Sequence, residues 1–154
     1  TYDGETFTKL IVDQGRSLIN VRHLIMDAGG NIWLAGQNGL WRYDGESFVN
    51  LSRDFCGYVY QDRAGNVWTS SMGPDAPGWV LSKYDFMTPH AEKPVATSLK
   101  TGEGMFFGIL EDTSQNIWVG KLNGAYRYDG KTFTEISGPP QTTFQNGLSL
   151  PKAD

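Results

Sequence analysis

The sequence predicts an all-β fold built from repeated antiparallel units, and three observations carry this prediction. The 154 residues include 19 Gly and 7 Pro, which indicates many tight turns, and no segment has helical periodicity. One pattern occurs three times, at Asp27–Phe48, Asp62–Phe86 and Asp112–Phe133. Tyr-Asp pairs begin at Tyr2, Tyr43, Tyr84 and Tyr128, at intervals of 41, 41 and 44 residues. A period of this length indicates a stacked or radial repeat.

Each copy is expected to form four short strands. In the first complete copy these strands are predicted at Val21–Met26, Asn31–Ala35, Leu40–Tyr43 and Ser47–Leu51. The segments are rich in aromatic and β-branched residues and are bounded by Gly, Asn and Asp, as in a β-meander. A four-stranded meander of about forty residues is typical of a propeller blade.

The turns between these strands have their own signals. Asp44-Gly45 and Asp129-Gly130 predict type I′ hairpins, in which two successive residues have positive φ. The second copy reads Tyr84-Asp85-Phe86 there, so it needs a different turn or a bulge. Gly30 and Gly65 are expected to be left-handed, and Gln115 at the same position of the third copy should cost a little strain.

The chain is therefore predicted to be a single β-propeller segment over residues 1–154. Blades are expected at about 21–51, 56–99 and 105–136, with an orphan outer strand at 1–10 and a tail at 137–154. Three blades do not close a ring, since rings have about four to eight. The two bare blade faces predict either a homodimer that completes a ring or a fragment of a larger ring.

The repeat resembles a known family. Asp-x-x-Gly-Asn-Ile-Trp, read from Asp27 to Trp33, is followed by Gly-Leu-x-Arg-Tyr-Asp-Gly, read from Gly39 to Gly45. This pattern resembles the two-component regulator propeller repeat, found mainly in sensor regions of bacterial hybrid two-component proteins. The resemblance covers nearly the whole chain, although the second copy is altered after Trp68. It implies an extracytoplasmic, periplasmic propeller that passes ligand occupancy to a kinase, while these residues contain no kinase, receiver or signal sequence.

Composition excludes several partners. The net charge is −4 and no Lys/Arg cluster occurs, which argues against nucleic acid and anionic membranes. No apolar run approaches the roughly 20 residues of a membrane-spanning helix, so membrane insertion is not expected. Cys56 is the single cysteine and aligns with the apolar positions Val21 and Phe106, so we expect a buried thiol and no intrachain disulfide.

The copies differ in the loops on one side of the predicted disc. The distance from the repeated Trp to the following Tyr is 10, 16 and 10 residues, and the connectors between blades vary as well. The longest insertion is Ser71–Trp79, and the longest connector is expected at Thr88–Gly104. Variable loops on a rigid scaffold often carry binding residues. The candidate ligand-binding residues on this face are Arg22, His23, Arg53, Asp54, Tyr58, Asp75, Trp79, His90, Glu103 and Phe107.

Several repeated residues have a structural interpretation. Trp33, Trp68 and Trp118 are expected to be packing anchors between blades. The carboxylates of Asp27, Asp62 and Asp112 could form a ring around a cation, but their place at the start of a tight turn favours bonds to the backbone. Trp79 is unique to its insertion, and core packing and a ligand platform remain equally open.

These patterns favour a non-enzymatic function, the recognition of a small molecule, an oligosaccharide or a protein surface. No catalytic motif, cofactor site or metal site is expected, because His23 and His90 lack the close spacing of a ligand pair. One alternative is a propeller enzyme similar to the streptogramin lyases, with His23 or His90, Glu103 and a divalent cation. A second alternative is a purely structural assembly unit.

Overall fold

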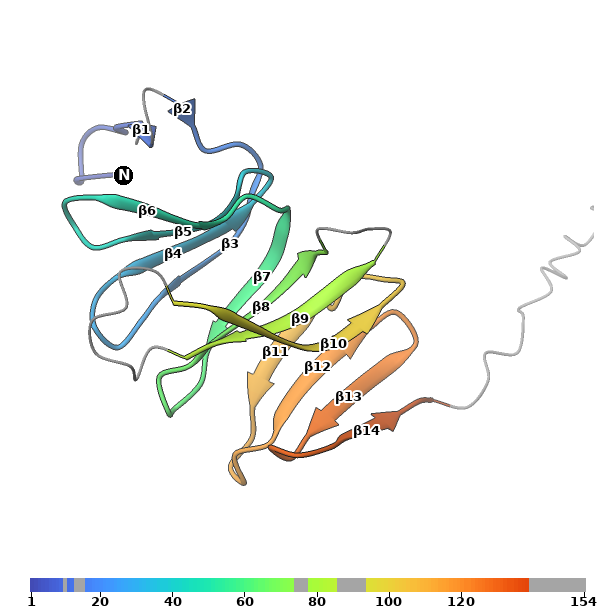
Figure 1. Cartoon of the computed structure of the whole chain (residues 1–154). Coiled ribbons are helices and arrows are strands. Elements are labelled where there is room, and N and C mark those ends of the chain that lie inside the picture. The colour runs from blue at the N-terminus through green and yellow to red at the C-terminus, as the bar shows by residue number, and fades with distance from the viewer. Residues whose placement is uncertain (10, 13–15, 74–77, 86–93, 139–154) are drawn as a thin grey trace, which may run out of the picture.

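The computed structural model describes the chain apart from residues 10, 13–15, 74–77, 86–93 and 139–154. All regular elements in this part are β-strands (Figure 1). No helix within it is long and apolar enough to cross a lipid bilayer. The predicted all-β class is therefore confirmed.

Twelve of the described strands form three antiparallel sheets of four strands each, and each sheet follows the order of the chain. The first sheet contains β3 (Val21–Met26), β4 (Ile32–Gly36), β5 (Gly39–Tyr43) and β6 (Phe48–Ser52). The second contains β7 (Cys56–Gln61), β8 (Val67–Met72), β9 (Trp79–Tyr84) and β10 (Ala96–Gly102). The third contains β11 (Gly108–Glu111), β12 (Ile117–Lys121), β13 (Gly124–Tyr128) and β14 (Phe133–Ile136). These meanders are consistent with propeller blades.

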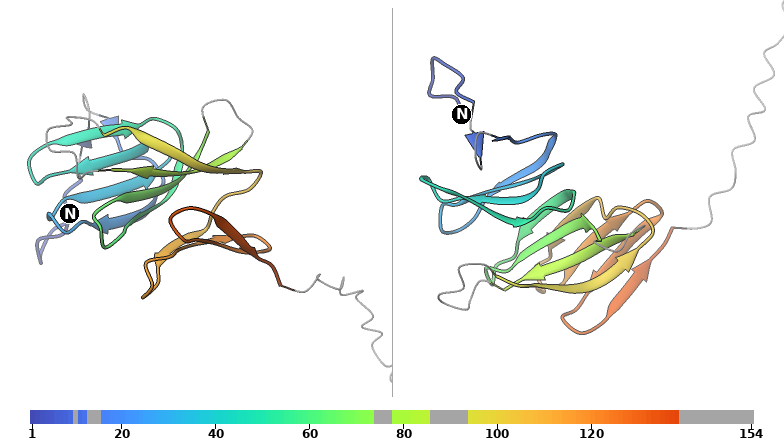
Figure 2. Two further views of the ribbon diagram at one scale, coloured as in Figure 1. Left: turned by 60° about the horizontal axis from the view of Figure 1, so that its bottom comes forward. Right: turned by 45° about the horizontal axis from the view of Figure 1, so that its top comes forward.

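The three sheets follow one another as a fan (Figures 1 and 2). The first strand of each sheet lies innermost, so that β7 packs beside β3 on one side and β11 on the other. The second sheet is therefore covered on both faces. Among the described residues, no hydrophobic cluster joins the third sheet to the first.

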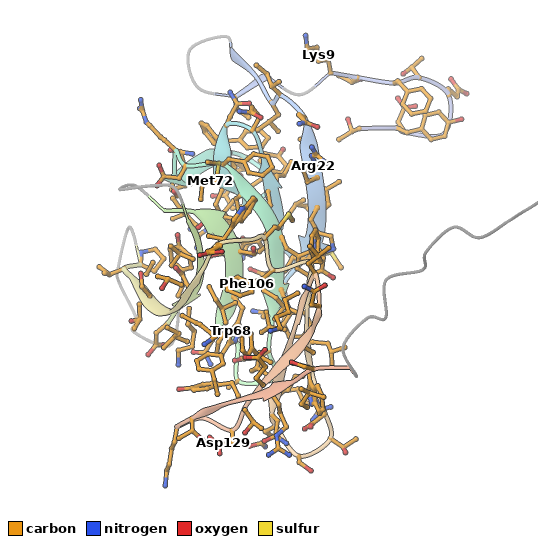
Figure 3. All side chains as sticks on the ribbon, turned by 90° about the vertical axis from the view of Figure 1, so that its right-hand side faces the viewer. Lys9, Arg22, Trp68, Met72, Phe106 and Asp129 are labelled. Carbon is orange, nitrogen blue, oxygen red and sulfur yellow. The ribbon has the colours of Figure 1, made fainter. Side chains whose placement is uncertain are left out.

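Two hydrophobic cores hold the fan together. In the first core, Trp33 and Leu40 of the first sheet pack with Val59, Val67 and Tyr84 of the second. In the second core, Trp68 and Leu81 of the second sheet pack with Phe106, Ile109 and Val119 near and within the third. Trp68 and Phe106, both labelled in Figure 3, belong to this second core. Trp33 and Trp68 thus act as the predicted anchors between sheets.

Equivalent positions of the repeat hold residues of different size in the two cores. Cys56 fills the first core and Phe106 the second, and both are almost fully buried. Burial raises the pKa of the Cys56 thiol to about 12. The expectation of a buried thiol is confirmed, and a thiol with such a pKa forms little thiolate at neutral pH.

The residues before the first sheet form two small hairpins. β1 (Ile11–Val12) pairs with β2 (Arg16–Ser17), and Val12 packs against Leu34 and Trp41 of the first sheet. A bridge between Tyr2 and Phe7 closes the other hairpin, which projects away from the sheets near Lys9 (Figure 3).

One prediction about loop length is wrong. β10 starts at Ala96, inside the segment expected to be the connector Thr88–Gly104, so the true connector to the third sheet begins only at Glu103. Tyr84 pairs with both Val67 and Ala96. The long connection between β9 and β10 therefore leaves the sheet at the same end as the Asp62 turn, opposite the expected face. The turn after Tyr84-Asp85, where the sequence predicts a different turn or a bulge, falls on residues 86–93, which lie outside the described residues; within β10 the register shifts between Ser98 and Lys100.

Candidate ligand-recognition site

The Asp-to-Trp turns are scaffold, and the sequence explains why. Asp27 Oδ1 accepts hydrogen bonds from the backbone N–H groups of Gly29 and Asn31, at 2.9 and 2.8 Å. Its Oδ2 accepts a bond from Trp33 Nε1 at 2.8 Å. A short polar side chain at the start of a turn commonly makes such backbone bonds.

The other two copies repeat this arrangement. Trp68 Nε1 donates to Asp62 and Trp118 Nε1 donates to Asp112, both at 2.8 Å. Burial opposes ionisation of Asp27, but the bonds from Trp33 and Asn31 outweigh it and lower the pKa. The bonds from Trp118 and Asn116 likewise lower the pKa of Asp112. These carboxylates already bind their own turns, as predicted, and the sequence reasoning missed only the bond to Trp.

The backbone of this turn is left-handed at one position. Gly30 and Gly65 have φ of 85° and 87°, and Gln115 has φ of 64°. The prediction for all three residues is confirmed. Gln115 takes a conformation that costs a residue with a Cβ more than it costs glycine.

The Tyr-Asp-Gly turns form a second scaffold element. Asp44 Oδ1 accepts bonds from the N–H groups of Glu46 and Ser47, and Asp129 accepts the equivalent bonds in the third sheet. These bonds lower the pKa of Asp44 to about 2. The type I′ prediction is wrong, because Gly45 has positive φ while Asp44 does not. Hydrogen bonds to the Asp side chain stabilise the turn, which therefore needs no second left-handed residue.

A third repeated feature escaped the sequence reasoning. On the neighbouring strand, a basic residue is paired directly opposite each anchoring Trp. These residues are Arg42, Lys83 and Arg127. A hollow of about 350 Å³ between the second and third sheets includes Trp68, Lys83 and Glu111 in its lining. Since it consists largely of repeated turn residues, it belongs to the scaffold.

Residues that differ between the copies gather at one place, which we name the Trp79 corner: Arg22, Phe55, Gly57, Trp79 and Met105. Trp79 and Phe55 meet edge to face with ring centroids 5.6 Å apart. The Arg22 guanidinium lies over the Phe55 ring at 5.9 Å. The corner thus combines an aromatic pair with an exposed cation.

Gly57 allows this corner to form. A Cβ at Gly57 would lie 2.2 Å from the Met105 methyl group and 3.4 Å from the Trp79 ring. The inner strand therefore lacks a side chain where Met105 and Trp79 cross it. Trp79 also packs partly against the second core and remains half-buried. Trp79 packs against its neighbours and also keeps an accessible part of its ring, so core packing and a ligand platform are both compatible with its position.

Two further candidates meet beside this corner. The rings of His23 and Tyr58 stack with centroids 3.9 Å apart, which joins the first and second inner strands. Both residues are half-buried, and Nδ1 of His23 has no hydrogen-bond partner among the described residues. The stack covers one face of each ring.

The remaining candidates are dispersed. Arg53, Glu103 and Phe107 are exposed, and the N–H of Asp54 is bonded to its neighbour Ser52. The backbone N–H of Phe107 donates to Gly120, which ties the connector to β12. Asp75 and His90 lie outside the described residues. Within the described part, no three His, Cys, Asp or Glu side chains gather in a way that could hold a metal ion.

The Trp79 corner was only partly visible in the sequence. Trp79 could be found because it stands in an insertion, where the other copies have the turn residues Asn38 and Asn123. Phe55 and Met105 come from two different connectors and Gly57 comes from the inner strand β7, so their meeting depends on how the inner strands pack. A scan against models of protein families and a search of curated proteins both gave no match.

Proposed function

We propose that this chain is a non-enzymatic recognition module of a β-propeller, and that it holds its ligand at the Trp79 corner. The carrying observation is the half-buried Trp79 ring, fixed by Phe55 and placed over Gly57 beside the exposed Arg22. A rigid Trp face stacks on a flat apolar surface such as a sugar ring or an aromatic ring. An exposed guanidinium adds up to five N–H donors for hydroxyl or carboxylate oxygens.

The same corner supports a sugar-like ligand more strongly than a purely apolar one. Phe55 holds the Arg22 guanidinium close to the aromatic pair, so that a ligand could meet ring and cation together. Sugars present both an apolar C–H face and polar oxygens. The resemblance of the repeat to extracytoplasmic sensor propellers of two-component regulators agrees with this role and suggests a periplasmic location.

Thermal unfolding in the presence of oligosaccharides tests the proposal. A panel of neutral and uronic-acid-containing oligosaccharides should contain a compound that raises the Tm of the chain. At a ligand concentration of about 100 Kd, binding adds about 2.7 kcal/mol to the stability of the native state. This corresponds to a rise of several degrees for a chain of this size.

Two variants make the result specific. Trp79→Ala should abolish the rise in Tm, because it removes the stacking face. Trp118→Ala is the matched control: it truncates another half-buried Trp, far along the chain in β12, and should keep the ligand-induced rise even if its own Tm is lower. A rise that persists in Trp79→Ala would refute this location of the site.

A further inference from the structure

The inner strands of the first two sheets carry the same irregularity near their start. The register of β3 with β4 shifts at Arg22, and the register of β7 with β8 shifts at Gly57. Such a bulge re-aims the side chain of the extra residue and is common beside binding sites. Both bulged residues belong to the Trp79 corner, so the shape of the corner depends on how the two bulges are placed relative to each other.

The residue after the bulge and its cross-strand partner differ between the copies. The pairs at this position are His23 with Ala35, Tyr58 with Ser70, and Gly108 with Gly120. Side chains of directly opposite residues lie on the same face of a sheet. The second copy is therefore the one that combines a large ring and a hydroxyl group in one cross-strand pair, which we name the Tyr58–Ser70 pair.

Tyr58 links the corner to the first sheet. Its ring stacks on the ring of His23, with centroids 3.9 Å apart and an angle of 21° between the planes. Because β3 and β7 belong to different sheets, side-chain contacts and not ladder hydrogen bonds set their spacing. His23 directly follows Arg22, whose guanidinium lies 5.9 Å from the centre of the Phe55 ring. The stack thus lies directly next to both bulges along the chain and holds Arg22 beside the aromatic pair.

Ser70 links the corner to the connector that leads into the third sheet. Ser70 is 0% exposed, and its hydroxyl oxygen accepts a hydrogen bond from the backbone N–H of Phe106 at 3.2 Å. The other two copies have no hydroxyl group at this position. Met105 directly precedes Phe106, and its methyl group lies above Gly57. The bond therefore fixes the connector next to the residue that completes the corner.

We propose that the Tyr58–Ser70 pair positions the Trp79 corner without touching the ligand, an inference that rests on the proposed function of this corner. Tyr58 acts through His23 on Arg22, and Ser70 acts through the connector on Met105. His23 and Tyr58, which the sequence suggested as ligand-binding residues, are then positioning residues. A long side chain that is already held in place loses less conformational entropy on binding, so this arrangement raises the affinity for a ligand.

The contacts of His23 predict which property of its side chain matters. Nδ1 of His23 is buried and has no hydrogen-bond partner among the described residues. The stack on Tyr58 needs only a flat ring, and a phenyl group supplies one. His23→Phe should therefore preserve the corner, whereas His23→Ala should release Arg22 and, through Phe55, disturb the surroundings of Trp79.

NMR spectroscopy of the ligand-free chain tests the positioning role. The chain contains four Met and five Trp residues, so Met105→Leu and Trp79→Phe assign the methyl signal of Met105 and the indole N–H signal of Trp79. Ser70→Ala should move the Met105 methyl signal toward that of the exposed Met26, because the connector loses its anchor. His23→Ala should shift the Trp79 indole signal, and His23→Phe should leave it near its wild-type position.

Phe48→Ala is the matched control. It removes another aromatic stack, in which the rings of Tyr43 and Phe48 lie 4.5 Å apart within a different hydrophobic cluster. This variant should lower the Tm and leave the Met105 and Trp79 signals unchanged, which a general loss of stability would not distinguish from the wild type.

Two spectroscopic results would overturn the inference. One is a Met105 signal that stays in place in Ser70→Ala, or a Trp79 signal that stays in place in His23→Ala. The other is a Trp79 signal that His23→Phe disturbs as much as His23→Ala. Ser70→Cys keeps the volume of the side chain and offers only a weak acceptor, so it repeats the test if Ser70→Ala does not fold.

A binding measurement separates this inference from the proposed function. For an oligosaccharide of the panel that raises the Tm of the wild-type chain, Ser70→Ala and His23→Ala should each bind about tenfold more weakly, and His23→Phe should bind like the wild type. Unchanged affinity in Ser70→Ala and His23→Ala would overturn the inference while the proposed function stands. If the NMR signals move as expected but no oligosaccharide binds the wild type, the proposed function fails and the positioning of the corner stands.

Discussion

The second and third sheets are built from the same pattern, but they differ in how many neighbours cover them. The second sheet has packed neighbours on both faces, and Val59, Val67 and Leu81 in it are completely buried. The third sheet has one packed neighbour, so Val119 on its covered side is buried while Trp118 on the other side is half-exposed. An identical residue in an identical turn can therefore contribute very different amounts to stability, and the neighbour decides which.

The largest effect on stability is expected when the anchoring Trp is truncated in each of the two environments. Trp33→Ala should lower the free energy of unfolding by about 3–5 kcal/mol, since it empties a fully buried site. Trp118→Ala should cost clearly less in dilute solution, because water already reaches one side of the ring. Urea unfolding monitored by circular dichroism measures both values. Equal losses would mean that the Trp acts through its own turn and not through the next sheet.

A smaller effect is expected at the carboxylates that bind these indoles. Asp27→Asn should cost about 1–3 kcal/mol, because the amide cannot accept all the bonds that Asp27 accepts in its buried turn. Asp112→Asn should cost less, since Asp112 is more exposed to water. Urea unfolding of the two variants measures the difference. A cost at Asp112 that matched the cost at Asp27 would contradict the role assigned to burial.

The smallest effect is expected at the Tyr-Asp-Gly turns, and it should be the same in the first and third sheets. The native pKa of Asp44 is about 2, below the ordinary value of about 3.9 for an unfolded chain. Its contribution is therefore complete above about pH 4 and disappears as the pH falls through about 2. Asp44→Asn and Asp129→Asn should each flatten the acid side of a stability-against-pH curve by a similar, small amount. A clear difference between them would show that the neighbouring sheets influence these exposed turns.

The strands of the first sheet could be placed from the sequence to within one residue. Val21–Met26 was predicted without error, because apolar and β-branched residues run up to a turn that begins with Asp. β10 was not recognised, since most of Ala96–Gly102 is exposed or half-exposed and gives no apolar alternation. That omission moved a long connection to the wrong end of the second sheet. The turn type at Asp44-Gly45 was wrong because a side chain, and not the backbone alone, stabilises it.

The sequence predicted on which side of the molecule the candidate site lies, but it did not predict all of the residues that form the site. Arg22 and Trp79 were identified from loops that vary between the copies, and Phe55 links them in the structure. His23 and Tyr58 were identified too, but they stack on each other. Met105 was not identified, because only the absence of a side chain at Gly57 brings it to Trp79. Contacts that depend on a missing side chain leave no pattern in a single sequence.

The bond between each indole N–H and its Asp carboxylate has a consequence for how motion spreads through the molecule. The indole ring belongs to one sheet by this bond and to the next sheet by packing, so a turn cannot rearrange without disturbing the layer beyond it. A local opening at the Asp27 turn would loosen the ring of Trp33 and be felt in the second sheet, whereas an opening at the Asp112 turn would end at the third. Each buried indole therefore couples its own turn to the next sheet, and this coupling acts equally in both directions.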